Sequence, residues 1–325
     1  MAKIEKIGIL TSGGDAPGMN AAIRAVVRCA SVAGIECYGI NDGYTGLVNG
    51  DVHKIDSRFV SDIIQKGGTV LRTSRCPEFV EHEVRQKGYD VLQAYGLEGL
   101  VVIGGGGSLA GMKAFYDDFK IPCVGLPGTI DNDLAYTDFT LGFDTAVNTV
   151  LASINNVRDT MTAHNRACII EVMGRHCGDI ALYAGTAGGA EIILVPEIPI
   201  DIKEVTKTIK QDRIKGKKSV IIILAEGVCS AKDLKEQLLA EIDGISIRTV
   251  KLGYIQRGGT PTMQDRILAA KCGARAIELF LTGNCGGRAV GIRDNKIIDM
   301  DIAEALEQKQ FFDDNLYRIS KILGK

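Results

Sequence analysis

The chain alternates short, continuously apolar runs with longer amphipathic stretches over most of its length. A run of five or six apolar residues without polar alternation is typical of a strand buried on both faces. Helices between such strands cover those faces, so we expect an α/β fold with mostly parallel sheets. We expect strands at KIGIL, GLVVIG, IPCVGL, RACIIEVMG, EIILVP and SVIIILAEG, and helices over 17–33, 108–118, about 144–160, from 178, and about 201–214.

The length of 325 residues exceeds that of one small core and predicts two domains. No flexible linker or low-complexity segment interrupts the pattern. The chain must therefore divide where it crosses from one sheet to another.

Charge and cysteine content exclude several classes of protein. A formal net charge of -2 gives no basic excess for nucleic acid or an anionic membrane. Nine cysteines without a C-x-x-C pair indicate reduced thiols rather than disulfides or zinc. We expect a cytoplasmic protein, because no signal-peptide or membrane-spanning pattern is present.

Two glycine-rich loops follow predicted strands. The first, TSGGDAPGMNAAIR, includes Gly14 and precedes an alanine-rich helix; the second is Gly104–Ser108. Bare amides at a helix N-terminus favour phosphate, although tight turns also explain the glycines. We expect Ser108 to cap the helix that follows. The Walker phosphate-binding pattern is absent, and a G-x-G-x-x-A match at 105–110 is a weak dinucleotide signal.

Two further loops carry charged groups. PGTIDND places Asp131 and Asp133 after a buried strand, where one carboxylate can accept a proton from a hydroxyl while the other orients it or contacts a metal. EVMGRHCGD delivers Arg175 to a glycine turn, where a guanidinium can bind phosphate. Arg75, Arg166, Arg248 and Arg257 add cations suited to phosphorylated substrates.

Taken together and in this order, the loops closely resemble those of bacterial ATP-dependent 6-phosphofructokinases. The resemblance rests on TSGGDAPGMNAAIR, PGTIDND, EVMGRHCGD, LAEG and IQRGG, and it spans nearly the whole chain. It implies transfer of the ATP γ-phosphate to the 1-hydroxyl of fructose 6-phosphate with Mg²⁺, in a homotetramer with a separate effector site. It also implies two Rossmann-like three-layer α/β/α domains with the active site in the cleft between them.

The resemblance assigns the two domains and their residues. Residues 1–142 with about 256–310 would bind nucleotide, and 143–255 with about 311–325 the sugar phosphate. Asp131 would be the base, beside Thr129, Ile130 and Asp133, and Arg75 and Arg175 would stabilise the phosphoryl group. The nucleotide positions are Gly14, Tyr44, Arg75, Cys76, Gly105, Gly106, Gly107 and Ser108. The sugar-phosphate positions are 129–131, Arg166, Met173, Gly174, Arg175, Glu226, Arg248, Tyr254, Ile255, Gln256 and Arg257.

Some of these positions imply more than one subunit. In the family, Arg166 and Arg248 reach in from a neighbouring subunit. The effector positions, where ADP or phosphoenolpyruvate act, match Arg24, Arg28, Arg58, Arg158, Gly189, Glu191, Lys215, Lys217 and Lys218, and Arg58 fits only with a one-residue shift in alignment.

The sequence departs from the family pattern at two positions. Gly106 replaces the acid associated with Mg²⁺, and Tyr254 replaces a histidine before IQRGG. We expect Gly106 to weaken metal positioning more than nucleotide binding, and Tyr254 to offer a hydrogen bond without a positive charge. Gly107 and Gly128 stand where pyrophosphate-dependent relatives carry an acid and a lysine, which favours ATP as donor.

Three hypotheses follow from these residues. The first is an ATP-dependent 6-phosphofructokinase with reduced turnover. The second is a catalytically impaired paralogue or variant that binds the ligands as a regulatory subunit. The third, a dehydrogenase, fits poorly because PGTIDND stands where an acid for the ribose is expected.

Overall fold

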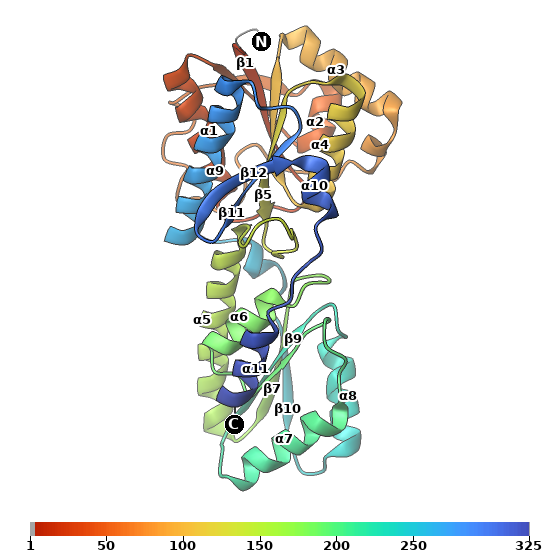
Figure 1. Ribbon diagram of the computed structural model, residues 1–325. Helices are drawn as coiled ribbons and strands as arrows, with labels where there is room; N and C mark the ends of the chain where they lie inside the picture. Colours follow the sequence, from red (N-terminus) through yellow and green to blue (C-terminus); the bar gives the residue numbers. More distant parts are fainter. Residues whose placement is uncertain (1–3, 325) are drawn as a thin grey trace. The chain divides into compact units, whose positions relative to one another are not determined.

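A computed structural model describes residues 4–324, which form two compact units. The first unit ends at Thr145 and resumes over Arg257–Gln310. The second comprises Ala146–Gln256 and the segment from Phe311 onward. The chain therefore crosses between the units three times, and each unit has its own sheet (Figure 1).

The sheet of the first unit has the strand order β12-β11-β5-β4-β1-β2-β3, and β6 pairs with β5. Its interior pairs are parallel, whereas the edge pairs β2–β3 and β11–β12 are antiparallel. The strands are β1 (Lys6–Ser12), β2 (Glu36–Ile40), β3 (Val52–Ile55), β4 (Gly99–Gly104), β5 (Cys123–Thr129), β6 (Leu141–Gly142), β11 (Arg288–Arg293) and β12 (Lys296–Asp301).

Helices cover both faces of this sheet (Figure 1). In α1 the apolar side chains Ile23, Val26, Val27 and Ala30 recur at helical spacing and are buried, and the helix ends at Gly34 in the left-handed region. Such an amphipathic stripe fixes which face the helix turns to the sheet. The helices are α1 (Met19–Ala33), α2 (Gly43–Asn49), α3 (His82–Tyr95), α4 (Gly106–Phe119), α9 (Met263–Thr282) and α10 (Ile302–Glu307), with the 3₁₀ turn η1 (Pro77–Val80).

The second unit has a four-stranded, wholly parallel sheet of order β10-β7-β9-β8. One core lies between this sheet and two helices, through Val205 and Ile209 of one helix and Leu234 and Leu238 of the other. The strands are β7 (Ala167–Val172), β8 (Ile192–Leu194), β9 (Val220–Ala225) and β10 (Ile247–Lys251). The helices are α5 (Phe143–His164), α6 (Asp179–Ala187), α7 (Ile202–Ile214), α8 (Ala231–Glu241) and α11 (Asp314–Leu323), with the 3₁₀ turn η2 (Gly253–Arg257).

The parallel α/β fold and the predicted strands are confirmed, but one predicted cap is wrong. Helix α4 begins at Gly106 with Gly105 as its N-cap, so Ser108 lies inside the first turn instead of capping it. Glycines give no side-chain signal for where a helix begins, which explains the two-residue error. No helix within residues 4–324 is long and apolar enough to cross a membrane.

Candidate active site

Three strands of the first unit end at the same level of the sheet. Ser12 of β1 pairs with Gly104 of β4, and Gly104 in turn pairs with Pro127 of β5. The glycine loops after β1 and β4 therefore begin beside Pro127, the first residue of PGTIDND, whose first three residues complete β5. In a parallel sheet this carboxyl edge is where ligands bind.

The loop after β1 is fixed by backbone contacts. The Gly13 amide donates to the Ser74 carbonyl at 3.3 Å, and the Thr73 hydroxyl donates to the Gly13 carbonyl at 3.0 Å. Arg257 Nη1 donates to the Asp15 carbonyl at 3.2 Å. This guanidinium would collide with a side chain at position 14, so Gly14 lets Arg257 lie against the loop. Arg257, predicted as a sugar-phosphate residue, thus lies beside the first predicted phosphate loop.

The loop after β4 leads directly into α4. At Gly104 a Cβ atom would lie 2.6 Å from both the Ser12 carbonyl oxygen and the Ser108 Cβ, so no side chain fits. The first turn of α4 carries no acid, and no side chain within the described range caps it. The positive end of the helix dipole and its amides are consequently available to an anion.

Tyr44 contacts the first turn of α4 from the hydrophobic core. Its hydroxyl donates to the Ser108 carbonyl at 2.7 Å, and its ring stacks on Phe79 with centroids 4.0 Å apart. Burial raises the pKa of the phenol well above its ordinary value. Tyr44 therefore holds the turn from the core side, whereas Arg75 is exposed and Cys76 half-buried at the start of η1.

The loop after β5 is held by several hydrogen bonds and carries two unlike carboxylates. Asp131 is 3% exposed, whereas Asp133 is exposed. The Thr129 hydroxyl accepts from the Asp131 amide at 3.1 Å and lies 3.5 Å from Asp133 Oδ1, to which it donates. Asn132 adopts a left-handed conformation, and its Oδ1 accepts from the Thr140 amide at 3.0 Å. A backbone held this firmly fixes the position of the Asp131 carboxyl group.

In the second unit, four of the predicted sugar-phosphate residues follow β7 and β9, namely Met173, Gly174, Arg175 and Glu226. Val172 pairs with Ala225, so the turn beginning at Met173 and the segment beginning at Glu226 start together. Glu226 Oε1 accepts from the Arg175 amide at 3.2 Å. The carboxyl edge of this sheet thus brings Arg175 and Glu226 to one place.

The η2 turn splits into a buried and an exposed part. Gln256 is fully buried and its Oε1 accepts from the Met173 amide at 3.1 Å. Tyr254 and Ile255 are 84% and 55% exposed. Gln256 therefore fixes the turn after β7, while the phenol of Tyr254 is accessible to a ligand.

Two predicted arginines lie at the opposite edge of the same sheet. Arg166 directly precedes β7, and Arg248, in the second position of β10, pairs with Cys168. Both therefore lie at the amino edge of this sheet, whereas Arg175 and Glu226 follow β7 and β9 at its carboxyl edge. Within one chain, the structure does not bring these arginines to that carboxyl edge.

The predicted effector residues of the second unit form a compact cluster. Glu191 Oε1 lies 3.3 Å from Arg158 Nη1 and 3.7 Å from Lys217 Nζ. Arg158 Nη2 donates to the Gly189 carbonyl at 2.6 Å. Lys215 ends α7, and Lys218 lines a neighbouring pocket with Lys217. Of the effector positions in the first unit, Arg24 and Arg28 lie on α1 and Arg58 in the turn after β3.

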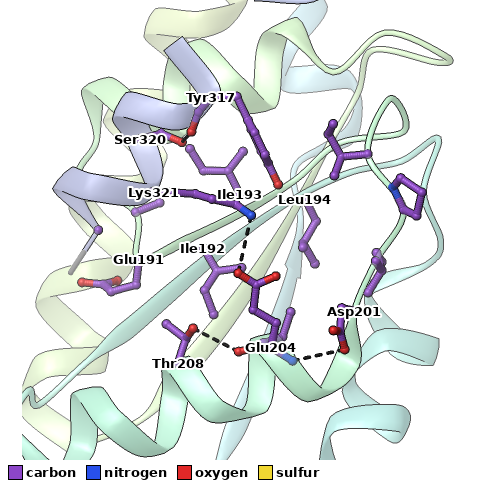
Figure 2. A pocket seen from close by; sticks show the side chains of 16 residues that line it. Glu191, Ile192, Ile193, Leu194, Asp201, Glu204, Thr208, Tyr317, Ser320 and Lys321 are labelled. Atoms are coloured by element: carbon purple, nitrogen blue, oxygen red, sulfur yellow. Dashed lines mark hydrogen bonds and ion pairs between the residues drawn. The ribbon is translucent and has the colours of Figure 1, made fainter. Parts of the chain in front are cut away.

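A second pocket of about 170 Å³ lies between β8, α7 and α11 (Figure 2). Lys321 Nζ and Glu204 Oε1 pair across it at 3.5 Å. Its lining contains Glu191 but none of the residues predicted for catalysis or for nucleotide and sugar-phosphate binding. It is separate from the strand ends that carry the predicted chemistry.

Sequence reasoning missed the buried Asp265 in the first turn of α9. Its carboxylate accepts from the Gly142 amide at 2.8 Å, the Thr145 amide at 2.9 Å and the Thr145 hydroxyl at 2.5 Å. Burial raises its pKa to about 6 against these hydrogen bonds, which lower it. The Thr262-x-x-Asp265 spacing, a variant of the capping box, was the available signal. Asp265 thereby fixes Gly142 and Thr145, just before the chain leaves the first unit.

Comparison with known proteins identifies the family. The phosphofructokinase family model matches residues 6–280. An ATP-dependent 6-phosphofructokinase of Clostridioides difficile is 55% identical over 99% of this chain and all of its own length. ATP-dependent 6-phosphofructokinase 1 of Clostridium perfringens is 53% identical over the same shares. The chain belongs to the phosphofructokinase family.

Solved structures agree with this assignment. Phosphofructokinase from Saccharomyces cerevisiae superposes with a TM-score of 0.89 and 35% identity over 93% of this chain, which spans 45% of the yeast chain. A pyrophosphate-dependent phosphofructokinase from Nitrosospira multiformis superposes with a TM-score of 0.87 over 99% of this chain and 92% of its own. At 18% identity the latter shows only the shared fold.

Proposed function

We propose that the protein is an ATP-dependent 6-phosphofructokinase, which transfers the γ-phosphate of ATP to the 1-hydroxyl of fructose 6-phosphate. The buried Asp131, fixed beside two glycine loops on one sheet edge, is the observation that carries this proposal. The names of the relatives, each an ATP-dependent 6-phosphofructokinase, support it. They lend no support to a ligand-binding subunit without turnover.

The first unit would hold the nucleotide. The amides around Gly14 and Gly105–Ser108 would bind its phosphates, because the N-termini of α1 and α4 favour anions. Tyr44 would act indirectly, through its hydrogen bond to the Ser108 carbonyl. Arg75 and Cys76 would lie along the nucleotide. The second unit would hold the sugar phosphate through Met173, Gly174, Arg175, Glu226 and the 254–256 turn.

Asp131 would act as general base. Its carboxylate accepts the proton of the sugar 1-hydroxyl as that oxygen attacks the γ-phosphorus, and the bond from phosphorus to the ADP oxygen breaks. Thr129 and Asp133 would orient the hydroxyl and the phosphates. The cations of Arg75 and Arg175 would stabilise negative charge on the group in transfer. The products are fructose 1,6-bisphosphate and ADP.

A divalent metal, Mg²⁺ in our proposal, fits this donor set in a limited way. Groups of three or more potential protein ligands are not found within residues 4–324. Mg²⁺ nevertheless binds through one or two carboxylates together with substrate phosphates, and the exposed Asp133 would supply a hard oxygen ligand after β5. When bound, the metal would offset phosphate charge. Gly106, at the start of α4, provides no further carboxylate for the metal, so we expect reduced turnover.

We further propose a cytoplasmic homotetramer on the basis of family resemblance. Because Arg166 and Arg248 lie at the amino edge of their sheet, they would complete the sugar-phosphate site of a neighbouring subunit. ADP and phosphoenolpyruvate would bind as effectors at the cluster of Arg158, Glu191 and Lys217. The site would be completed by the remaining effector positions, which are Arg24, Arg28, Arg58, Gly189, Lys215 and Lys218.

A coupled ADP-release assay with fructose 6-phosphate, ATP and Mg²⁺ tests the proposal. We expect ADP release that depends on the sugar phosphate and saturates with it. A parallel assay of fructose 1,6-bisphosphate formation with pyrophosphate as donor should give no product. ADP release that is independent of the sugar phosphate, or no release at micromolar enzyme, would refute the assignment.

A further inference from the structure

The turn that presents Arg175 is held by side chains from three separate segments. Gln256 binds the Met173 amide and Glu226 binds the Arg175 amide. A third acceptor, Oε1 of Glu197, binds the Gly178 amide at 2.8 Å. Gln256 and Glu226 belong to the predicted sugar-phosphate set, whereas Glu197 has no role in the reaction described above.

The backbone of this turn is in a conformation that needs support. Gly174 has φ of 133° and Arg175 has φ of 54°, so two consecutive residues lie at positive φ. A non-glycine residue in the left-handed region costs about 1 kcal/mol or more, and it keeps this conformation only where surrounding contacts offset the cost. The direction of the Arg175 guanidinium therefore depends on the anchors at both ends of the turn.

Glu197 anchors the far end of the turn, where α6 begins. The N-cap of α6 is Gly178, which has no side chain, and the helix dipole there favours a negative charge. The carboxylate of Glu197, three residues after β8 ends, occupies the place of a capping side chain. The contact is close: a Cβ on Gly178 would lie 2.5 Å from Glu197 Oε2 and from Val195 Cβ.

The environment of the second carboxylate oxygen of Glu197 shows that this contact has an energetic cost. Oε2 is buried and has no hydrogen-bond partner among residues 4–324. Burying an unsatisfied polar atom costs free energy, so the hydrogen bond of Oε1 to the Gly178 amide and the favourable end of the helix dipole must offset that cost. Glu197 is thus held against the N-terminus of α6 by this hydrogen bond and by the helix dipole.

We propose that Glu197 is a positioning residue for phosphoryl transfer. It holds the N-terminus of α6 against the end of β8 and thereby fixes the turn 173–178 so that Arg175 meets the sugar phosphate and the transferring group. This inference rests on the proposed function, because it assigns a purpose to the position of Arg175. Glu197 does not contact substrate in this account.

The experiment compares variants at Glu197 with a matched cap elsewhere in the same unit. Glu197→Ala removes the acceptor, Glu197→Asp retracts it by one methylene, and Glu197→Gln keeps an acceptor of the same length. Asp201→Ala is the control, because Asp201 caps α7 by accepting from the Lys203 amide at 2.9 Å and the Glu204 amide at 3.2 Å. Each variant is measured by amide hydrogen exchange and by steady-state kinetics.

We expect faster exchange over 174–182 in E197A, a KM for fructose 6-phosphate raised about 10-fold and a kcat lowered about 10-fold. The KM for ATP of E197A should stay within about 2-fold of that of the unsubstituted protein. Because E197Q keeps the acceptor, its kcat and its KM for fructose 6-phosphate should stay within about 3-fold. D201A should change exchange only around 202–206. If E197A does not fold, E197D is expected to show the same pattern more weakly.

Two results would overturn the inference. Unchanged exchange over 174–182 in E197A and E197D would show that Glu197 does not hold the turn, whatever the turnover. Faster exchange with an unchanged KM for fructose 6-phosphate and unchanged kcat would show that the turn does not position Arg175 for the reaction. Absence of turnover in the unsubstituted protein would instead refute the proposed function, which this design distinguishes.

Discussion

The carboxyl edges of the two sheets are built in different ways. In the first unit, glycine backbone at Gly104 and the uncapped N-terminus of α4 leave amides open, and the loop after β5 holds the buried carboxyl group of Asp131. In the second unit, three amides of the turn 173–178 donate to the side chains of Gln256, Glu226 and Glu197. One edge offers backbone to a ligand, whereas the other uses side chains to aim an arginine. The difference suits a nucleotide recognised by its phosphates and a sugar phosphate recognised by charged side chains.

The strongest test of the first edge is Asp131→Asn. An amide has nearly the same shape but cannot accept the proton, so kcat should fall about 10³-fold while the KM for ATP stays within about 3-fold. Steady-state kinetics at saturating fructose 6-phosphate measure this. A loss of less than about 10-fold would mean that another group is the base.

A sharper test of the same edge compares one acid at two neighbouring positions. A Cβ on Gly106 would touch only Leu134 at 3.6 Å, and one on Gly107 meets nothing within 4 Å, so both positions accept a side chain. Gly106→Asp should raise kcat roughly 10-fold or more with Mg²⁺ by restoring a carboxylate for the metal. Gly107→Asp should raise the KM for ATP by a similar factor, because the acid would face a phosphate.

Equal rates for the Gly106→Asp variant and the unsubstituted protein would show that the missing acid is not limiting. An unchanged KM for ATP in the Gly107→Asp variant would show that the α4 N-terminus does not face a phosphate.

The pH dependence of stability tests the buried carboxyl group of the first unit. Asp265 has a folded pKa of about 6, above the ordinary value of 3.8, so its contribution to stability is greatest below pH 3.8 and is lost as the pH rises through 6. Relative to Asp265→Asn, the free energy of unfolding should therefore increase as pH falls from 7 to 5, by about 1 to 2 kcal/mol. Urea unfolding at several pH values measures it, and a constant or opposite difference would contradict the account.

The smallest expected effect concerns the support beneath α4. Tyr44→Phe removes the hydrogen bond to the Ser108 carbonyl but keeps the ring on Phe79. We expect a loss of about 1 kcal/mol in stability and a rise of about 2- to 5-fold in the KM for ATP. A KM for fructose 6-phosphate that rose instead would assign Tyr44 to the other substrate.

The sequence predicted the parts of the fold that depend on local pattern. Continuous apolar runs gave β1, β4, β5, β7, β8 and β9, but the remaining strands, which lack such runs, were not predicted. The two glycine loops and PGTIDND were predicted at strand ends, where they lie. The start of α4 was missed because Gly104–Gly107 carry no side-chain signal. Glu197 was missed because its partner Gly178 is brought near by the placement of β8 beside β9 and β7, which no short motif encodes. The anchoring side chains of the second edge are thus a property of topology rather than of motif.

Amide hydrogen exchange with each ligand alone tests most directly whether the first sheet edge binds the nucleotide and the second binds the sugar phosphate. A non-hydrolysable ATP analogue with Mg²⁺ should protect the segments 13–19 and 105–109 after β1 and β4, and fructose 6-phosphate should protect 173–178 and 226–228. If the nucleotide analogue protected 173–178 and left 13–19 and 105–109 unchanged at saturation, the assignment of ligands to sheet edges would be wrong.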